Sequence, residues 1–195
     1  MHLMHDGMIR ALARGGMIEP FFEGQARPIS NGLGSFGYDA TLGTEFRYLR
    51  PKLPEECMAI DPHKLSPEQI DDLFYTEHAD YMVIQPASFV LGHSVEMFHI
   101  PNNVLGICLG KSTYARFGII INVTPLEPGW SGQVTIEITN HGPYPFVVHA
   151  GDGIAQFIFL QNETPPQKTY RDRGAKYQHQ RGVVLPRVRV VDPTP

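Results

Sequence analysis

Hydrophobic and polar residues alternate most regularly between residues 133 and 140. Successive side chains of a β-strand point to opposite faces, so this alternation predicts a strand with one apolar and one polar face. Glu137 is the only ionisable side chain in this strand, and it lies on the polar face. The apolar positions are Val134, Ile136 and Ile138, and the polar positions are Gln133, Thr135, Glu137 and Thr139.

Short apolar runs follow one another between residues 80 and 160, with turn residues between them. Their spacing of about ten residues is typical of an all-β barrel or a jelly-roll-like sandwich. An earlier run, bracketed by glycines, predicts one more short strand. We expect strands over residues 38–42, 81–84, 88–92, 96–100, 104–109, 118–123, 133–140, 146–149 and 154–160.

Two short helices are also predicted. Apolar residues recur at near-helical spacing within residues 6–14, and two glycines follow as a stop signal. A second helix is expected after Ser66, which is suited to be its N-cap, with Pro67 at the first helical position. Gln69 completes a capping box, and this helix should end near residue 74.

The composition supports one mainly β domain. The chain has 195 residues, of which 42% are hydrophobic and 18% charged, as in ordinary soluble domains. Its 17 prolines and 19 glycines disfavour long helices and favour short strands joined by turns. We expect a single domain over residues 1–195, with an N-terminal helix and arm over 1–24 and a C-terminal tail over 163–195.

The formal net charge of −4 argues against general binding of nucleic acid through a basic surface. No segment has the length and apolar character of a signal peptide or a membrane span. Cys57 and Cys108 lie far apart in the sequence and are expected to be reduced thiols. We therefore expect a soluble, cytoplasmic protein that binds neither nucleic acid nor membrane.

The tail carries a local excess of positive charge. Between residues 168 and 181, five lysines and arginines stand against one acid, Asp172. A nucleoside triphosphate carries a comparable charge of the opposite sign, so this segment is suited to cover phosphates as a lid, with Tyr170 and Gln180 offering hydrogen bonds. A solvated basic tail explains the same residues, because charge runs usually face water.

A compact polar cluster lies between two apolar runs, at Lys111, Ser112, Thr113 and Arg116. A turn or short helix there would project the cluster from one sheet edge, and Ser112 and Arg116 would share a face of a helix because they are four residues apart. The sequence Gly-Lys-Ser also ends a phosphate-binding P-loop, but the preceding glycine lies one residue too close. The P-loop interpretation therefore fails.

A catalytic zinc site is not expected. The chain has no Cys-x-x-Cys pair. His93, Glu96 and His99 form an H-x-x-E-x-x-H pattern, but a strand would divide these side chains between its two faces. His2 and His5 lie near the N-terminus, where histidines are usually inert, and no role is assigned to them.

The Tyr38–Asp39 pair follows a glycine-rich segment. These residues could touch a ligand, but a capping aspartate at the start of a strand explains them equally well, and we favour that structural interpretation. Without a metal, acid–base chemistry would need a carboxylate. Glu137 is the candidate, because burial could raise its pKa and turn it into a general base. A glutamate on the polar face of a strand is otherwise simply solvated.

Several separated segments resemble the dCTP deaminases, zinc-free relatives of the trimeric dUTPases. They are GKSTYARFG at 110–118, TPLEPGWSG at 124–132, TIEITN at 135–140, GIAQF at 153–157 and AKYQHQRG at 175–182. The resemblance extends from about residue 35 to about residue 185. It implies a mainly β fold, the dUTPase-like β-clip or distorted jelly-roll barrel, with a few short helices.

The resemblance also implies an activity. The chain would hydrolyse dCTP to dUTP and ammonia, supplying dUTP towards dUMP and dTTP synthesis, with Glu137 as general base and acid. Ser112 and Arg116 would orient Glu137 and the attacking water. Magnesium would bind through the substrate triphosphate rather than at a protein site. Each active site would be shared between subunits of a homotrimer, and inhibition by dTTP stays open.

The resemblance further assigns substrate contacts to the loop at 111–116, to the strand around Glu137, to the turn before it and to the tail. The full set is Lys111, Ser112, Thr113, Tyr114, Ala115, Arg116, Glu127, Thr135, Ile136, Glu137, Gln156, Tyr170, Lys176 and Gln180.

Two other functions remain open. One is a bifunctional dCTP deaminase/dUTPase that forms dUMP and pyrophosphate, although residues 122–125 lack the aspartate expected in the sugar-binding hairpin of a dUTPase. The other is a non-catalytic trimer that binds deoxynucleotides, against which the joint presence of Ser112, Arg116 and Glu137 argues.

Overall fold

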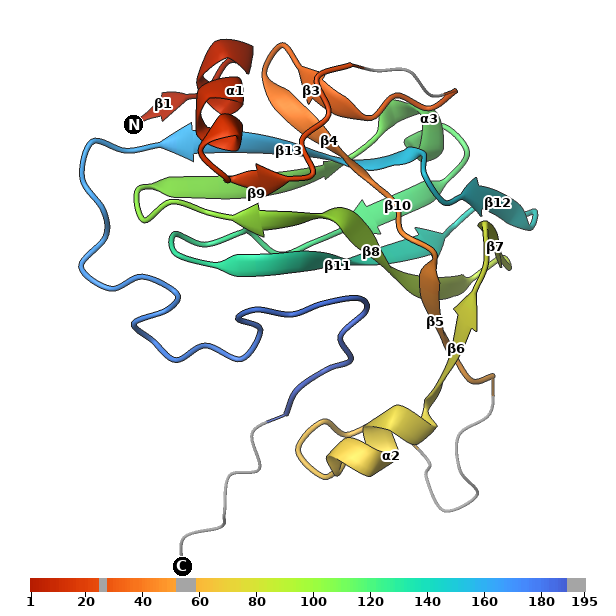
Figure 1. The fold of residues 1–195 in the computed structure, drawn as a ribbon. Helices are drawn as coiled ribbons and strands as arrows, with labels where there is room; N and C mark the ends of the chain where they lie inside the picture. The colour runs from red at the N-terminus through yellow and green to blue at the C-terminus, as the bar shows by residue number, and fades with distance from the viewer. Residues whose placement is uncertain (25–27, 52–58, 189–195) are drawn as a thin grey trace, which may run out of the picture.

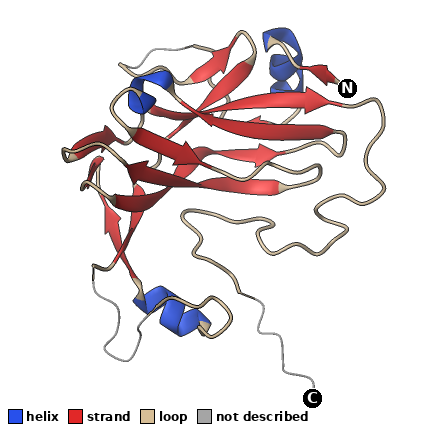
Figure 2. Ribbon diagram, turned by 180° about the vertical axis from the view of Figure 1, so that it is seen from behind, coloured by secondary structure: helices blue, strands red, loops and turns tan. Residues whose placement is uncertain are grey.

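The computed structural model describes residues 1–24, 28–51 and 59–188. Figure 1 shows two larger sheets stacked on each other, with a helix near the N-terminus and a long tail that passes below the second sheet. Figure 2 shows the same layers from behind. Cys57 and the end of the tail, residues 189–195, lie outside the described residues. The mainly β fold expected from the sequence is confirmed.

The first sheet has the strand order β1-β13-β4-β3, and β9 also pairs with β13, from Ala155 to Gln161. The second sheet has the order β10-β11-β8-β5-β6, and β2 also pairs with β8. A small third sheet joins β12 to β7. The bounds are β1 (His2–Leu3), β2 (Ile18–Glu19), β3 (Gly32–Gly34), β4 (Gly37–Thr41), β5 (Glu45–Leu49), β6 (Phe74–His78), β7 (Tyr81–Ile84), β8 (Ser88–His99), β9 (Val104–Gly110), β10 (Ile119–Asn122), β11 (Ser131–Asn140), β12 (Phe146–His149) and β13 (Gly153–Gln161).

The core lies between the two larger sheets. Phe98 of β8 packs against Phe157 of β13 with 5.2 Å between ring centroids, and it meets Tyr38 of β4 edge to face. All three side chains are fully buried. Aromatic rings bury a large apolar area each, so this cluster is a major source of the hydrophobic stabilisation that joins the sheets.

The three helices are short: α1 (Asp6–Arg14), α2 (Pro67–Asp72) and α3 (Ser112–Ala115). The predicted helix over 6–14 is confirmed, and His5, to which no role was assigned, caps it by accepting a hydrogen bond from the Gly7 amide. The capping box of α2 is confirmed too. The Ser66 hydroxyl accepts from the Gln69 amide at 3.2 Å, and the Gln69 side chain accepts from the Ser66 amide at 2.8 Å.

The prediction of two separate strands over 88–92 and 96–100 is wrong, because β8 runs without a break through both. Its pairing with β11 shifts register between Gln133 and Thr135. At this irregularity the Ser94 hydroxyl accepts from the Val134 amide and donates to the Glu96 carbonyl, each at 2.8 Å. A polar side chain thus replaces the missing ladder contact, so the strand continues through residues that resemble a turn in the sequence.

The three residues of the H-x-x-E-x-x-H pattern lie in different surroundings. Glu96 is fully buried and accepts hydrogen bonds from the Thr41 amide and hydroxyl and from Tyr38, and burial raises the pKa of its carboxyl. The His93 ring contacts the Ser94 carbonyl. Within residues 1–24, 28–51 and 59–188, no group of three His, Cys, Asp or Glu side chains is arranged to hold a metal ion.

No helix in the described ranges is long and apolar enough to cross a membrane.

The alternation that the sequence shows along β11 is confirmed, because Val134, Ile136 and Ile138 are buried while the residues between them are half-buried. The half-buried polar face of β11 lines the candidate site.

Candidate active site

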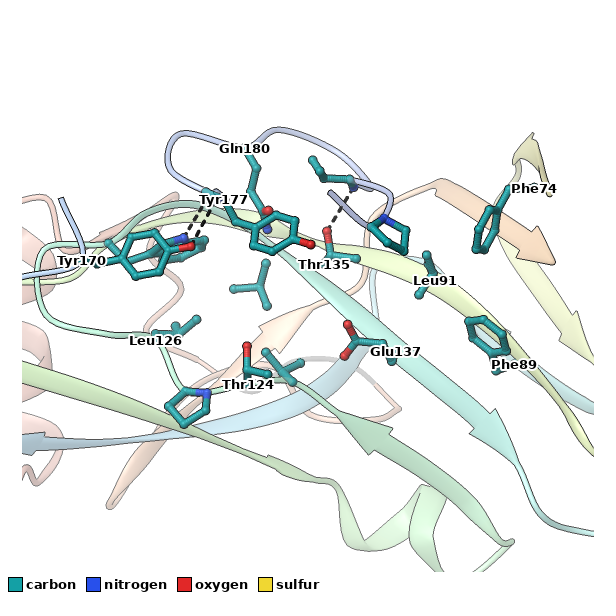
Figure 3. Close-up of a pocket in the computed structure, with 16 residues that line it drawn as sticks. Phe74, Phe89, Leu91, Thr124, Leu126, Thr135, Glu137, Tyr170, Tyr177 and Gln180 are labelled. Carbon is teal, nitrogen blue, oxygen red and sulfur yellow. Dashed lines mark hydrogen bonds between the residues drawn. The ribbon is translucent and has the colours of Figure 1, made fainter. Parts of the chain in front are cut away.

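A cavity of about 380 Å³ lies over the polar face of β11. Figure 3 shows Thr135 and Glu137 of this strand pointing into it, with Thr124 and Leu126 on one side. Tyr170, Tyr177 and Gln180 come from the tail and close the opposite side. Because the tail passes over part of it, the polar face of β11 is half-buried rather than fully solvated.

Glu137 lies at the base of this cavity, between Asn122 of β10 and Leu91 of β8 in the sheet. Burial is the main cause that raises the pKa of its carboxyl, to about 7. Its Oε2 atom is buried and has no hydrogen-bond partner among the described residues. A buried carboxylate oxygen without a donor is costly, so this atom is placed to bind a water or a ligand proton.

The tail is fastened along the first half of β11 by backbone pairing. The His179 amide donates to the Ser131 carbonyl at 2.7 Å, and the Gln133 amide donates to the Gln180 carbonyl at 3.0 Å. The Val184 amide then donates to the Thr135 hydroxyl at 3.1 Å. The second half of β11 pairs instead with β10. The cavity therefore lies beside β11 at the point where the pairing with the tail ends and the pairing with β10 begins.

Trp130 joins the turn before β11 to the tail. Its indole N–H donates to the Tyr177 carbonyl at 2.9 Å, and the Tyr177 amide donates to the Tyr170 hydroxyl at 3.1 Å. Both tyrosine rings line the cavity. Tyr177 was not predicted as a site residue, although it stands in the same segment as Lys176 and Gln180. Its neighbours in that motif were the only sequence signal for it.

The other end of the cavity is apolar. Phe74, Phe89 and Leu91 line it, and the rings of Phe74 and Phe89 meet edge to face at 6.5 Å. Sequence reasoning missed all three, because a hydrophobic residue on a strand has the same pattern whether it lines a cavity or the core. An apolar wall beside one carboxylate is a common design for binding a planar ring, since few polar groups then set its orientation.

The predicted site residues divide into two groups. Thr135, Glu137, Tyr170 and Gln180 line the cavity. Of the rest, Ile136 is buried in the core below the strand, Glu127 forms an exposed ion pair with Arg173 at 3.4 Å, and Lys176 donates to the Arg187 carbonyl at 2.9 Å. Gln156 stands opposite Asp39 in the first sheet.

The loop at 111–116 does not reach the cavity of its own chain. It forms α3, in which Ser112, Thr113 and Ala115 are exposed, and Arg116, the C-cap of this helix, is exposed too. Tyr114 is 1% exposed, and its ring packs edge to face on Phe146 with 6.1 Å between centroids. The predicted substrate contact of Tyr114 can therefore come only from its backbone, because its side chain anchors the helix in the core.

Lys111 precedes α3 and lies in a buried ion pair. Its ammonium contacts the Asp39 carboxylate at 2.5 Å and the Ser30 hydroxyl at 3.1 Å, and both charged side chains are almost fully buried. The other oxygen of Asp39 has no partner within the described part of the chain. Asp39 therefore does more than cap the start of a strand, because it fixes the residue from which α3 begins.

Asp39→Asn is expected to lower the free energy of unfolding by about 3 kcal/mol, because it leaves the buried Lys111 ammonium without a countercharge. Asp71→Asn is the matched control, since Asp71 pairs with Arg47 at 3.6 Å while largely exposed. That change should cost less than about 1 kcal/mol. Denaturant unfolding of both variants measures the difference, and equal midpoints would show that the buried pair does not stabilise the fold.

The raised pKa of Glu137 predicts a pH dependence of stability. Between about pH 4.5 and 7 the unfolded chain ionises this carboxyl while the folded chain holds its proton, so stability falls as the pH rises through that window. Glu137→Gln should flatten the fall by about 1 kcal/mol, less than the full shift because solvent reaches part of the side chain. Thermal midpoints of both proteins from pH 4 to 8 test this, and parallel curves would contradict it.

The chain is similar to a known family of proteins. Residues 3–162 match the family described as dCTP deaminase-like. The dCTP deaminases of Granulibacter bethesdensis and Acidiphilium cryptum are 50% and 49% identical to the chain over 191 residues, which is 96% of this chain and 100% of each relative.

A solved 2'-deoxycytidine 5'-triphosphate deaminase from Agrobacterium tumefaciens shares the fold, with a TM-score of 0.62 at 19% identity. The match covers 82% of this chain but only 46% of that longer protein. The family model matches most of this chain, and relatives are about half identical to it over 96% of its length. This chain therefore belongs to the dCTP deaminase-like family.

Proposed function

We propose that this protein converts dCTP and water to dUTP and ammonia, with Glu137 as the group that moves protons. The observation that carries the proposal is a carboxyl at the base of a cavity, with a pKa of about 7 and one buried oxygen that has no partner in the described part of the chain. The substrate is inferred from relatives that are about half identical to this chain and are named dCTP deaminases.

A carboxyl with a pKa near 7 is suited to both halves of this reaction. As a carboxylate, Glu137 takes a proton from the water that attacks carbon 4 of the cytosine ring. The protonated side chain gives that proton to the ring nitrogen next to carbon 4. Glu137 then takes the second proton from the new hydroxyl on carbon 4 and gives it to the departing amino group. The 4-amino group leaves as ammonia, the water oxygen becomes the new carbonyl, and Glu137 ends as it began.

We further propose that the site is completed by a neighbouring subunit of a homotrimer. Ser112 and Arg116 are exposed on α3 and line no part of the cavity in their own chain. Exposed apolar side chains, Phe117 and Ile120, stand next to that helix. Apolar patches beside polar residues are common at protein interfaces, so α3 is suited to enter the cavity of the next subunit and orient Glu137 and its water.

The tail, residues 163–195, acts in this proposal as a lid. Tyr170 and Gln180 already close the cavity, and Lys176 lies on the same segment. Phosphates are contacted by Lys111, Ser112, Thr113 and Lys176, with backbone groups of Tyr114 and Ala115, while Glu127, Thr135, Ile136 and Gln156 hold the sugar and base. Magnesium arrives with the triphosphate as part of the substrate.

A product assay tests the function. The protein is freed of metal, resupplied with magnesium and given dCTP, and ammonia, dUTP, dUMP and pyrophosphate are measured separately. Ammonia with an equal amount of dUTP is expected. Formation of dUMP with pyrophosphate would make the protein a bifunctional deaminase and dUTPase. Binding of dCTP without turnover would make it a silent deoxynucleotide-binding protein and overturn the proposal. Adding dTTP to the same assay tests feedback.

A further inference from the structure

A second hollow, of about 450 Å³, shares Trp130 with the cavity described above and is otherwise lined by different residues. It lies where the end of β8, the start of β11 and the tail meet, since His99, Ser131 and Arg171 all line it. None of the residues proposed to contact dCTP belongs to it. The hollow is therefore separate from the proposed substrate site but adjoins it through one side chain.

Hydrogen-bond donors dominate this hollow. Its polar lining residues are His99, Asn102, Ser131, Arg171 and His179, and no carboxylate is among its lining residues. The tail also contains Asp172, but the Thr169 amide and hydroxyl engage its carboxylate at 2.9 and 2.8 Å. A guanidinium and two imidazoles without a facing acid form a site for an anion.

The ring of one donor, His99, and the backbone that carries another, His179, are held in place. The His99 ring nitrogen Nδ1 lies 2.6 Å from the Ser131 hydroxyl. When that hydroxyl donates to Nδ1, a neutral ring carries its proton on Nε2, which is then free to donate to a ligand. The residues beside His179 are held too, since Gln180 donates from its side chain to the Gln133 carbonyl at 2.7 Å.

The backbone at His179 is unusual. Its φ angle is +58°, in the left-handed region that disfavours every residue with a Cβ atom. Glycine would adopt this conformation without that cost, so the backbone gives no reason for a histidine there. A residue other than glycine whose backbone is held in a disfavoured conformation at the edge of a hollow is a frequent mark of a binding position.

We propose that this hollow binds a phosphoryl group, either as free inorganic phosphate or as the phosphate of a nucleotide, and so fastens the tail to the barrel. His99 comes from the sheet, where Ser131 orients its ring, while Arg171 and His179 come from the tail. One anion bound between these side chains would hold the tail against the barrel. This site is independent of the deaminase reaction, so its test needs no turnover.

Trp130 is the only tryptophan of the chain and lines the hollow, which makes its fluorescence a direct signal. The full-length protein is titrated with inorganic phosphate, pyrophosphate or dUMP at constant ionic strength. We expect a saturable change that His179→Gly and Arg171→Ala weaken by about tenfold or more, since each removes one strong donor. Arg181→Ala is the matched control, because it removes an exposed cation of the same tail outside the hollow.

His179→Gly should fold normally, with an equal or higher thermal midpoint, because glycine relieves the left-handed backbone. Tighter binding of dUMP than of phosphate would identify a nucleotide as the source of the phosphoryl group, and equal binding would identify free phosphate. The proposal is overturned if no anion gives a saturable change, or if His179→Gly binds as the wild type does. Loss of the signal in Lys176→Ala but not in His179→Gly would assign the anion to the substrate site and overturn it too.

Discussion

Glutamine in place of Glu137 is expected to lower kcat for dCTP by about a thousandfold or more, while substrate binding stays within a few-fold of the wild type. The amide has the size of the carboxyl but cannot accept a proton from water, and a positioned general base contributes rate factors of this order. Single-turnover kinetics with dCTP, together with direct binding measurements, separate the two effects.

The pH dependence belongs to the same expectation. Because burial raises the pKa of Glu137 to about 7, the carboxylate form is lost as the pH falls below that value. The ratio kcat/KM should therefore fall about tenfold per pH unit on the acid side. A flat profile down to pH 5 would show that this ionisation does not limit the reaction.

Glu163→Gln is the matched control, since it removes the same charge from an exposed position outside the lining of the active-site cavity. Its kcat should be unchanged. If Glu137→Gln keeps full activity while both variants fold, the proton must move through another group, and the chemistry proposed for the cavity would have to be abandoned.

The sequence pattern predicted the strand on which Glu137 lies and the face that it occupies, but not its environment. An alternating strand looks the same whether its polar face meets water or a covering segment. Here the cover is formed by Tyr170, Tyr177 and Gln180, which lie more than thirty residues further along the chain. Only the fold brings them over β11, so periodicity could not distinguish a solvated glutamate from a buried base.

Contacts with distant residues decide other local features too. Residues 93–95 look like a break between two strands, yet the Ser94 hydroxyl accepts from the Val134 amide of β11 and the strand continues. The Tyr114 side chain packs on Phe146 and anchors α3 in the core, which the short loop sequence by itself does not indicate. In both cases a long-range partner decides the role of a residue, and local sequence carries no information about that partner.

Mixing two inactive variants is expected to restore activity. Arg116→Ala removes the guanidinium that α3 would offer to a neighbour, and Glu137→Gln removes the base from the cavity. In a trimer with shared sites, an intact site forms wherever an Arg116→Ala subunit supplies Glu137 and the next subunit, Glu137→Gln, supplies Arg116. Every mixed trimer of this kind contains one such junction among its three, so about a third of the sites in mixed assemblies should be active.

Co-expression of the two variants with different affinity tags, followed by purification on both tags, gives the mixed assemblies for a steady-state assay with dCTP. A mixture of Glu137→Gln with Glu137→Ala is the control, and it should stay inactive because no site contains the base. If the first mixture is equally inactive although mixed assemblies are recovered, Arg116 and Glu137 must act within one chain. The α3 helix would then have to move towards the cavity of its own subunit, against the anchoring of Tyr114 in the core.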